Sequence, residues 1–326
     1  MQTRSIGSLA VSVVGIGCNN FGRELDGDAT NRIIHAAIDA GITFFDTADS
    51  YGKPKTTSET LVGEALKGRR DKVVIATKFG RRLDETRGGG SAHYVRAATE
   101  ASLRRLQTDR IDLMQMHIPD PETPIEETLG ALRDLQGEGK IREIGGSNLS
   151  AAQLRAVNEA ANAAGLPRFV SVQEEFSLLH REPVANLLAE CERQDVRLLP
   201  FRPLFHGLLT GKYNGGAPAA GSRIANRSAE QQSELLSPSN LARVAALTGF
   251  AQAHGRSLLE LAFAWLLAHE AVPSIIAGVS SPGQVASNAA AASWTLNAED
   301  MAAIDALLEA QPQSVAGANN EFSGSR

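Results

Sequence analysis

The sequence predicts an eight-stranded parallel β/α barrel (a TIM barrel) from three observations: the alternation of its segments, its size and the placement of its polar residues. Eight short apolar segments alternate with helical sequence, and this alternation favours parallel pairing of the strands. The chain has 326 residues, 43% of them hydrophobic, which suits one large barrel with a sizeable core. We therefore predict a single barrel domain over residues 1–310 and a polar tail over residues 311–326.

The strands are expected where short apolar or β-branched runs end in polar residues or glycine. In chain order they span 13–17, 43–46, 73–78, 111–117, 141–146, 169–173, 197–201 and 274–278. Residues 6–17 alternate in polarity and hold Gly7 and Ser8 at a turn, which predicts a small N-terminal hairpin that leads into the first strand.

Helical spacing fills the intervals between these strands. The expected helices span 28–40, 57–66, 92–106, 124–135, 151–164, 183–194, 241–254 and 258–269, with extra C-terminal helices at 284–292 and 299–308. The helix at 151–164 has clear boundaries, because Ser150 is a suitable N-cap and Gly165 a suitable stop. A long loop that contains glycine and serine is expected from about residue 202 to Pro238.

Composition and charge exclude several functional classes. The net charge of −5 argues against nucleic acid or an acidic membrane as a partner. Cys18 and Cys191 are the only cysteines, too few for a disulfide framework. The first ten residues are polar and no run of 18 apolar residues occurs, so we expect neither a signal peptide nor a membrane span. These features together favour a cytoplasmic protein.

Polar residues and a glycine lie at the C-terminal ends of the predicted strands, or one residue beyond. They are Asp46, Lys78, His117, Asn148, Gln173 and Gly278. In a parallel barrel these strand ends meet at one mouth, where the active sites of such barrels lie. The sequence therefore predicts a functional site built from several distant segments.

Four residues at this mouth suggest acid–base chemistry. Tyrosine has an ordinary pKa of about 10, so Tyr51 becomes a useful proton donor only if a cation stabilises its phenolate. Lys78 follows a very apolar strand and needs an anionic partner, which Asp46 on the neighbouring strand can provide. His117 could join Tyr51 in binding a carbonyl oxygen. Each residue alone also fits a plain structural role, but four in register favour a catalytic set.

At this point the chain resembles the aldo-keto reductase family over almost its full length. The matching segments are Phe44-Phe45-Asp46-Thr47-Ala48, Tyr51-Gly52, Ala76-Thr77-Lys78, Arg110-Ile111-Asp112-Leu113, His117, Gly146-Ser147-Asn148, Gln173 and Gly207-Leu208-Leu209-Thr210-Gly211-Lys212. The resemblance implies a barrel oxidoreductase that transfers a hydride between NAD(P)H and the carbonyl of a small aldehyde, ketone or sugar. It also implies roles for the four residues: Tyr51 is the general acid, Lys78 lowers its pKa, Asp46 holds Lys78, and His117 orients the carbonyl.

The same resemblance implies a cofactor site. Ser147, Asn148 and Gln173 would bind the nicotinamide carboxamide, and Phe201 would stack on the nicotinamide ring in place of the tyrosine usual in the family. The loop from Leu204 to Lys212 would wrap the cofactor diphosphate with its backbone and with Lys212. The members of this loop expected to bind are Leu204, Gly207, Leu208, Gly211 and Lys212, and Arg202 precedes it, placed either for a phosphate contact or for solvent.

NADP(H) is the predicted cofactor, with appreciable use of NAD(H). The segment from Gly278 to Gln284 has no basic residue, which by charge alone favours NAD. However, Ser280, Gln284 and Asn288 are similar to the neutral set of the potassium-channel β-subunit branch of the family, which is known for NADP. The N-terminus of the helix at Gln284 adds N–H donors and a favourable dipole.

Two alternatives and one expected absence complete the prediction. A regulatory subunit that binds the cofactor, like the channel β-subunits, would share the fold. A two-layer dehydrogenase is disfavoured, because Asn20 stands where the third glycine of a dinucleotide fingerprint begun at Gly15 and Gly17 should be. No histidine or cysteine has metal-ligand spacing, so no metal is expected.

Loops 19–26, 80–91 and 118–121 and the C-terminal tail are expected to set substrate specificity.

Overall fold

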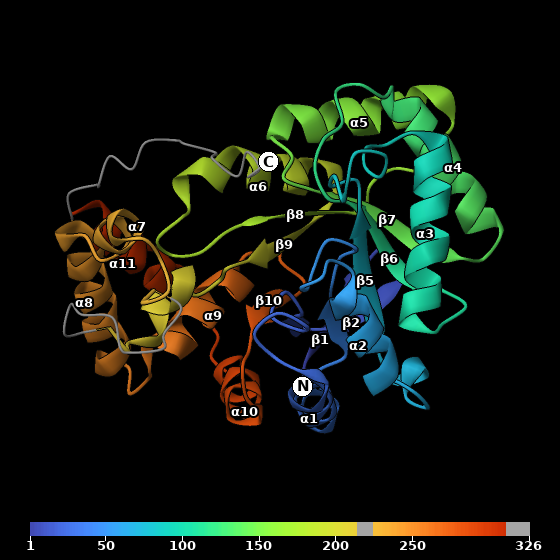
Figure 1. The fold of residues 1–326 in the computed structure, drawn as a ribbon. Coiled ribbons are helices and arrows are strands. Elements are labelled where there is room, and N and C mark those ends of the chain that lie inside the picture. Colours follow the sequence, from blue (N-terminus) through green and yellow to red (C-terminus); the bar gives the residue numbers. More distant parts are fainter. Residues whose placement is uncertain (214–223, 311–326) are drawn as a thin grey trace.

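The predicted strands pair in parallel and close into a barrel in the order β10-β3-β4-β5-β6-β7-β8-β9, which confirms the predicted fold. The structure is a computed structural model that describes residues 1–213 and 224–310, so the predicted tail lies outside the described residues. The barrel strands are β3 Val14–Gly17, β4 Phe44–Asp46, β5 Val74–Phe79, β6 Ile111–Met116, β7 Ile141–Ser147, β8 Ser171–Glu175, β9 Arg197–Phe201 and β10 Ile275–Gly278. Figure 1 shows the strands inside a ring of helices.

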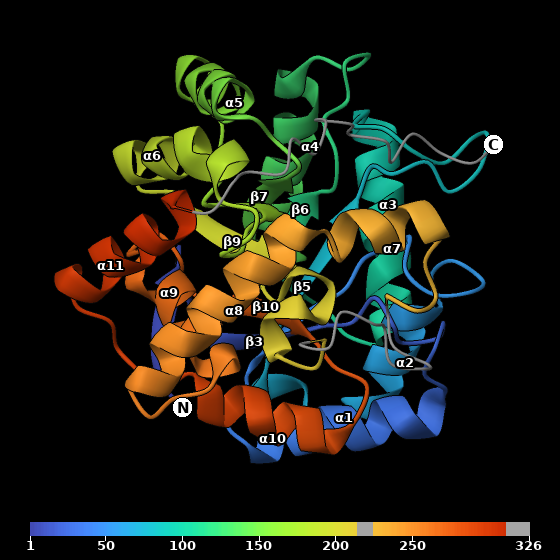
Figure 2. The ribbon, with the colours of Figure 1, turned by 90° about the vertical axis from the view of Figure 1, so that its left-hand side faces the viewer.

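The helices form where amphipathic segments have suitable ends. They are α1 Gly27–Asp39, α2 Thr57–Ala65, α3 Ala92–Leu106, α4 Ile125–Gly137, α5 Ala151–Ala164, α6 Ala185–Gln194, α7 Ala229–Leu235, α8 Pro238–Ala253, α9 Leu258–Ala268, α10 Pro282–Ala291 and α11 Ala298–Glu309. In α5, Ser150 and Gln153 form a reciprocal capping box, and Gly165 ends the helix with a φ of 64°. Viewed along the barrel, α8 and the yellow segment that follows β9 lie in front of the strands (Figure 2).

Side-chain alternation sorts the strand residues into layers inside the barrel. Phe44, Ala76, Leu113, Leu199 and Ile276 belong to one buried cluster, although they come from five different strands. Side chains two residues apart on a strand point to the same face. The next side chains along the chain that point into the barrel are therefore Asp46 on β4, Lys78 on β5 and Gln115 on β6. An apolar layer therefore lies directly below a polar layer at the barrel mouth.

The N-terminal hairpin covers the opposite end of the barrel. Its strands, β1 Thr3–Ile6 and β2 Leu9–Ser12, pair antiparallel as predicted. Ile6, Leu9 and Val11 are fully buried and belong to the same cluster as the apolar layer. Arg4 ties the hairpin to the body by donating to the carbonyl oxygens of Leu267 at 2.7 Å and Val272 at 2.6 Å.

The long loop expected between β9 and Pro238 is not wholly irregular. It contains the 3₁₀ helix η3, Phe205–Thr210, and the seven-residue helix α7. None of the residues of α7 is buried, so the segment carries no apolar periodicity that could reveal it. Two shorter 3₁₀ turns, η1 Arg70–Lys72 and η2 Glu182–Val184, precede β5 and α6. In the described ranges, no helix is long and apolar enough to cross a membrane.

Candidate active site

Lys78 is the centre of the polar layer. Its side chain is fully buried, and its Nζ donates to Asp46 Oδ2 at 2.7 Å and to the Thr47 carbonyl oxygen at 2.9 Å. The same Nζ lies 3.4 Å from the Tyr51 hydroxyl oxygen and 4.9 Å from the centre of the Tyr51 ring. A buried ammonium is costly unless it is paired and hydrogen-bonded. Lys78 therefore connects a carboxylate to the phenol, as the sequence predicts.

Two glutamines hold the carboxylate of Asp46 in place. Gln115 on β6 donates to Asp46 Oδ1 at 3.2 Å, and Gln173 on β8 donates to the same oxygen at 2.9 Å. All three side chains are almost completely buried. Asp46 thus has both carboxylate oxygens occupied, one by the glutamines and the other by Lys78. This leaves the carboxylate little freedom to move away from Lys78.

The loop after β4 turns Tyr51 back over the barrel mouth. Asp49 N–H donates to the Lys78 carbonyl oxygen at 3.1 Å, and Tyr51 N–H donates to the Ala48 carbonyl oxygen at 3.2 Å. Gly52 then adopts a φ of 101°, and a Cβ atom there would lie 3.0 Å from the Ser58 backbone nitrogen. Only glycine fits such a position without strain. Glycine at 52 therefore allows the chain to place Tyr51 beside Lys78 and then enter α2.

His117 lies one residue beyond β6 and contacts the ring of Tyr51. The two rings meet edge to face, with centres 5.7 Å apart and an angle of 82° between their planes. Ser50 Oγ lies 3.4 Å from His117 Nδ1, and His117 N–H donates to the Phe79 carbonyl oxygen at 2.8 Å. The tetrad of Asp46, Tyr51, Lys78 and His117 is therefore assembled at one point of the mouth.

The charges and burial of the tetrad set its protonation. Burial by itself would lower the pKa of Lys78, but Asp46 and Tyr51 outweigh it and raise the pKa, so the amine stays charged. Burial raises the pKa of Tyr51, while Lys78 opposes that rise, so the phenol keeps its proton at neutral pH. Burial, followed by the charges of Lys78 and Arg81, lowers the pKa of His117 well below its ordinary value. The imidazole is therefore neutral.

The residues expected at the nicotinamide lie around the next three strands. Ser147 Oγ donates to the Gln173 carbonyl oxygen at 3.0 Å, and Asn148 Nδ2 donates to the His117 carbonyl oxygen at 2.8 Å. Asn148 has a φ of 58°, a conformation that asparagine tolerates better than most residues. Phe201 ends β9 and is partly exposed. The structure therefore brings these four residues to the mouth beside the tetrad.

The segment expected at the diphosphate bends sharply. Phe205, His206 and Gly207 have φ values of 42°, 56° and 96°, and Gly211 has a φ of 79°. Glycine is favoured at 207 because its φ of 96° is strained for other residues, and a Cβ atom there would also lie 3.2 Å from Lys212 Nζ. Leu204 and Leu208 anchor the loop in the core.

Two backbone amides and one arginine of this loop already have partners within the protein. Gly207 N–H donates to the Leu204 carbonyl oxygen at 2.8 Å, and Gly211 N–H donates to the Leu208 carbonyl oxygen at 3.2 Å. Arg202 is bonded to Glu175 Oε2 at 2.6 Å, an ion pair that neither alternative for this arginine anticipated. A phosphate would therefore be held by Lys212 and by other amides of the loop.

Arg202 and Arg227, from the long loop after β9, and Arg23, from the loop after β3, lie near one another. Burial lowers the pKa of Arg227, the nearby charges of Arg202 and Arg23 lower it further, and the charge of Glu175 raises it. Arg23 follows β3 and Arg227 precedes α7. Clustered cations of this kind are stabilised by an anion, and a diphosphate provides two charges. The arrangement fits the phosphate groups of a dinucleotide.

The region after β10 offers neutral hydrogen-bonding groups. Gln284 Oε1 accepts from Ser280 N–H at 2.8 Å and from Ser280 Oγ at 3.1 Å, and Gly278 before them is exposed. Asn288 is 4% exposed, and its Nδ2 has no hydrogen-bond partner in the described part of the chain. A buried amide donor without a partner is costly, which fits a ligand group at this position.

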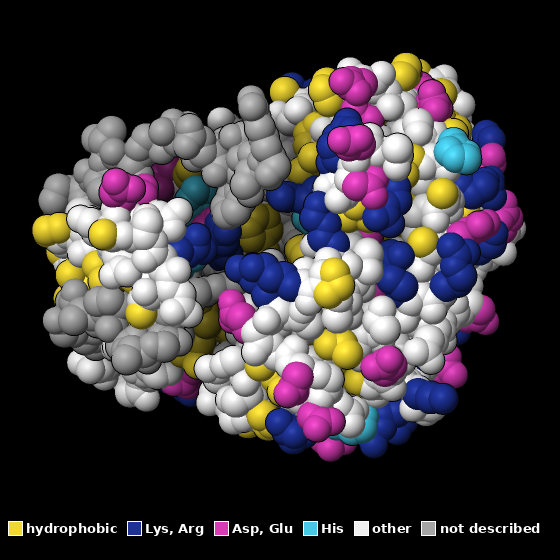
Figure 3. Space-filling model, viewed as in Figure 1, with side chains coloured by type: hydrophobic (Ala, Val, Ile, Leu, Met, Phe, Trp, Pro, Cys, Tyr) yellow, Lys and Arg dark blue, Asp and Glu magenta, His cyan; other side chains and the backbone are white. Residues whose placement is uncertain are grey.

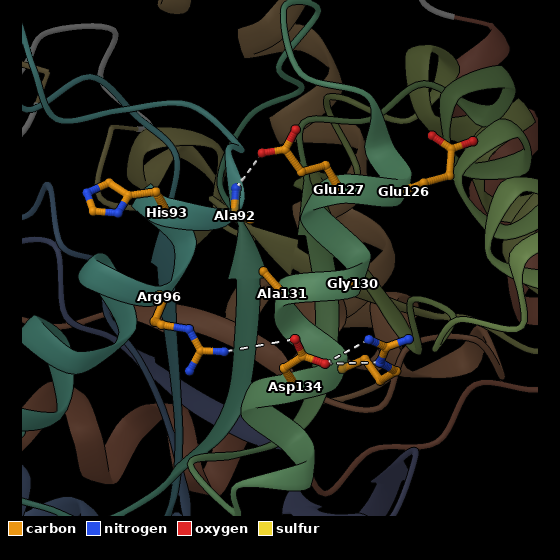
Figure 4. Close-up of a pocket in the computed structure, with 9 residues that line it drawn as sticks. Ala92, His93, Arg96, Glu126, Glu127, Gly130, Ala131 and Asp134 are labelled. Atoms are coloured by element: carbon orange, nitrogen blue, oxygen red, sulfur yellow. Dashed lines mark hydrogen bonds and ion pairs between the residues drawn. The ribbon is translucent and has the colours of Figure 1, made fainter.

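A surface groove lies away from the barrel mouth. It encloses about 480 Å³ between α3 and α4, on the outside of the barrel (Figure 4). Its charged side chains largely neutralise one another: Arg96 and Arg133 both contact Asp134, and Glu127 accepts from Ala92 N–H at 2.8 Å. Over residues 1–213 and 224–310, no group of three or more His, Cys, Asp or Glu side chains could hold a metal ion.

Sequence reasoning missed several residues of this site. Gln115 lies within a strand that is buried on both faces, which hides its polar role. Its position two residues after Leu113 and two before His117 places it on the inward face, and this spacing was the available signal. Arg23 and Arg227 had no sequence signal, because their proximity depends on how two distant loops fold.

Comparisons with known proteins agree with this geometry. A model of the aldo/keto reductase family matches residues 13–309. The chain is 34% identical to the aldo-keto reductase YhdN of Bacillus subtilis (strain 168) over 325 residues, which cover 95% of this chain and 94% of that protein. It is 32% identical to the L-glyceraldehyde 3-phosphate reductase of Escherichia coli (strain K12) over 320 residues, which cover 94% and 92% of the two chains. It is also 33% identical to the aldo-keto reductase str7 of Strobilurus tenacellus over 321 residues, which cover 95% and 92%. The fold, the arrangement at the barrel mouth and these similarities establish that the chain belongs to the aldo/keto reductase family and is an oxidoreductase of carbonyl substrates, in a family whose members typically depend on NAD(P)H.

Proposed function

We propose that this protein reduces the carbonyl group of a small aldehyde, ketone or sugar with Tyr51 as the general acid. The observation that supports this proposal most directly is the chain of contacts from Asp46 through Lys78 to Tyr51, with distances of 2.7 Å and 3.4 Å. Lys78 keeps its charge in a buried site, so it can stabilise the phenolate that forms when Tyr51 gives up its proton.

The proton and the electron pair go to different atoms of the carbonyl group. NAD(P)H, if held by Ser147, Asn148, Gln173 and Phe201, would supply the hydride to the carbonyl carbon. Tyr51 gives its hydroxyl proton to the carbonyl oxygen, and the neutral His117 contributes a hydrogen bond that orients this oxygen. Charge is balanced because the phenolate left on Tyr51 lies beside the Lys78 ammonium.

NADPH is the proposed preferred cofactor. Asn288 has a buried amide without a partner, and Ser280 and Gln284 present neutral polar groups at the N-terminus of α10. These donors, together with the helix N-terminus, suit the 2′-phosphate of NADP. Because no basic side chain lies in this segment, the preference should be modest and NADH should also be used. A kcat/KM with NADH that exceeds the value with NADPH would contradict this part of the proposal.

The decisive experiment replaces Tyr51 by phenylalanine. Tyr51→Phe should lower kcat for a panel of aldehydes and ketones about 10²- to 10⁴-fold, the usual contribution of general acid catalysis. Cofactor affinity, measured by fluorescence titration, should stay near wild type, because only the hydroxyl is removed. Tyr213→Phe is the matched control, since the buried Tyr213 hydroxyl has no hydrogen-bond partner among the described residues. Normal turnover by Tyr51→Phe would show that another group donates the proton.

A further inference from the structure

The backbone of Arg81 lies beside the tetrad. It follows Lys78 by three residues, immediately after β5 and Gly80. Gly80 has a φ of 105°, and its carbonyl oxygen accepts from Gly89 N–H at 2.9 Å. A Cβ atom built on Gly80 would lie 3.9 Å from the His117 backbone nitrogen. The turn at Gly80 therefore fixes the starting point of Arg81 next to His117.

The charge of Arg81 has no partner in the described part of the chain. Its Nε is buried without a hydrogen bond, and neither an ion pair nor a hydrogen bond joins its guanidinium to a described residue. Its neighbours differ: Arg82 donates to the Glu85 carbonyl oxygen at 3.1 Å, and Arg87 pairs with Asp84 at 2.6 Å. A partly buried guanidinium without a partner is unfavourable, so an anion is the group that this position lacks.

Acidic residues in the loops after the two strands that flank β5 are already engaged in hydrogen bonds. Asp120, in the loop after β6, accepts from Gly90 N–H at 2.7 Å and from Thr123 Oγ1 at 2.7 Å. Asp49 accepts from the Tyr94 hydroxyl at 3.3 Å. The protein therefore leaves Arg81 to an anion from outside.

Arg81 is also close to the position of the substrate. Burial raises the pKa of Tyr51, and Lys78 and Arg81 oppose this rise; burial lowers the pKa of His117, and Lys78 and Arg81 lower it further. The charge of Arg81 thus acts on both groups proposed to hold the carbonyl oxygen. The residues proposed for the nicotinamide and for the 2′-phosphate lie at or after the ends of β7, β8, β9 and β10, whereas Arg81 follows β5. Arg81 therefore lies on the substrate side.

Basic side chains border a hollow in the surface of the molecule. The whole chain has a net charge of −5, yet Lys and Arg side chains gather around the hollow in the face of Figure 3. Such a concave site attracts anions and raises their local concentration. Arginine is also suited to carboxylate and phosphate, because its planar fork of N–H donors matches their oxygens.

We propose that Arg81 binds an anionic group of the substrate, a carboxylate or a phosphate ester a few atoms from the carbonyl carbon, so that the enzyme prefers short anionic aldehydes and ketones. This inference rests on the proposed reductase function and adds the class of its substrate. One end of the molecule contacts Tyr51 and His117, and the other contacts the guanidinium. Neutral carbonyl compounds of the same length lack the second contact.

Matched pairs of substrates test this inference. The phosphate arm compares glyceraldehyde 3-phosphate with glyceraldehyde, and the carboxylate arm compares succinic semialdehyde with butanal. Wild type should show a higher kcat/KM for the anion in at least one arm. Arg81→Gln should lower the anion-to-neutral ratio of kcat/KM in that arm about 10- to 100-fold, the range for a lost charge-assisted hydrogen bond. Arg81→Lys should keep part of the ratio, and the exposed control Arg82→Gln should leave it unchanged.

Two other readouts separate this inference from its rivals. If Arg81→Gln weakens NADPH binding and leaves the ratio unchanged, Arg81 contacts the cofactor and the inference is wrong. A ratio equal to wild type in both arms, whatever the change in absolute rates, also overturns it.

Failure of the reductase function can be recognised separately. Wild type would then turn over no carbonyl compound, and calorimetric titration with glycerol 3-phosphate and with succinate still decides the role of Arg81. Binding of either anion that weakens about 10-fold or more in Arg81→Gln, but not in Arg82→Gln, supports the anion site. Absence of wild-type binding of both anions refutes it.

Discussion

Replacing Asp49 by asparagine is expected to make the protein more stable above neutral pH. Asp49 is 1% exposed, its Oδ2 accepts from the Tyr94 hydroxyl at 3.3 Å, and its Oδ1 has no partner among the described residues. Burial raises the pKa of Asp49 to about 7, Glu59 adds to this rise, and Arg105 and Lys78 oppose it. Ionising Asp49 therefore costs stability, although its backbone belongs to the loop that carries Tyr51.

The size and sign of the effect follow from this shift. The pKa rises from 3.8 to about 7 on folding, so the folded state binds more protons than the unfolded state between these values. The contribution of protonated Asp49 to the free energy of unfolding is therefore fully present below about pH 4. It falls as the pH rises toward 7, with a total loss of about 4 kcal/mol. About 3 kcal/mol of that loss falls between pH 5 and pH 8. Asparagine keeps an acceptor for Tyr94 and never ionises.

Urea unfolding at several pH values between 5 and 8 measures the prediction. The free energy of unfolding of Asp49→Asn, minus that of wild type, should increase by about 3 kcal/mol across this range. Subtraction removes the contributions of all groups that the two proteins share. Glu64→Gln, an exposed acid-to-amide change on α2, should give a curve parallel to wild type. A constant difference between Asp49→Asn and wild type would refute the reasoning, because Asp49 would then be ionised throughout.

Two further predictions concern the metal and the cofactor. Treatment with a chelator should leave turnover unchanged, because in the proposed mechanism Tyr51 and His117 supply the acid and the polarising group; loss of activity that one divalent ion restores would contradict this. Ser280→Asp should shift the ratio of kcat/KM for NADPH and NADH toward NADH on the order of tenfold or more, because it places a like charge beside the 2′-phosphate. Ser287→Asp, exposed further along α10, is the control, and an equal shift in both variants would point to a general effect of charge.

The barrel could be predicted from sequence because its elements carry local signals that agree with the fold. The helix α5 begins at a capping box and ends at Gly165, and the structure gives it the predicted bounds. Parallel pairing then brings the strand ends together, so Asp46, Lys78 and His117 were predictable as neighbours. The helix α7 was missed because it buries no residue and has no periodic apolar face.

Contacts between loops were beyond sequence reasoning. The ion pair of Arg202 with Glu175 joins the residue after β9 to the end of β8, and no local pattern announces it. The unpartnered guanidinium of Arg81 is a property of its three-dimensional surroundings, since Arg82 next to it finds a backbone acceptor. Sequence reasoning could assign loop 80–91 to specificity, but not the residue in it that carries the charge.

The N-terminal hairpin helps to keep the surroundings of the Asp46–Lys78 ion pair at a low dielectric constant. Ile6, Leu9 and Val11 are fully buried against the apolar layer that lies beneath Asp46 and Lys78. A hydrocarbon floor of this kind keeps water, with its high dielectric constant, away from the lower side of the ion pair, so the field of the ammonium is screened less on its way to Tyr51. We therefore expect the strength of Tyr51, the proposed acid at one end of the barrel, to depend on a two-stranded ribbon at the other end.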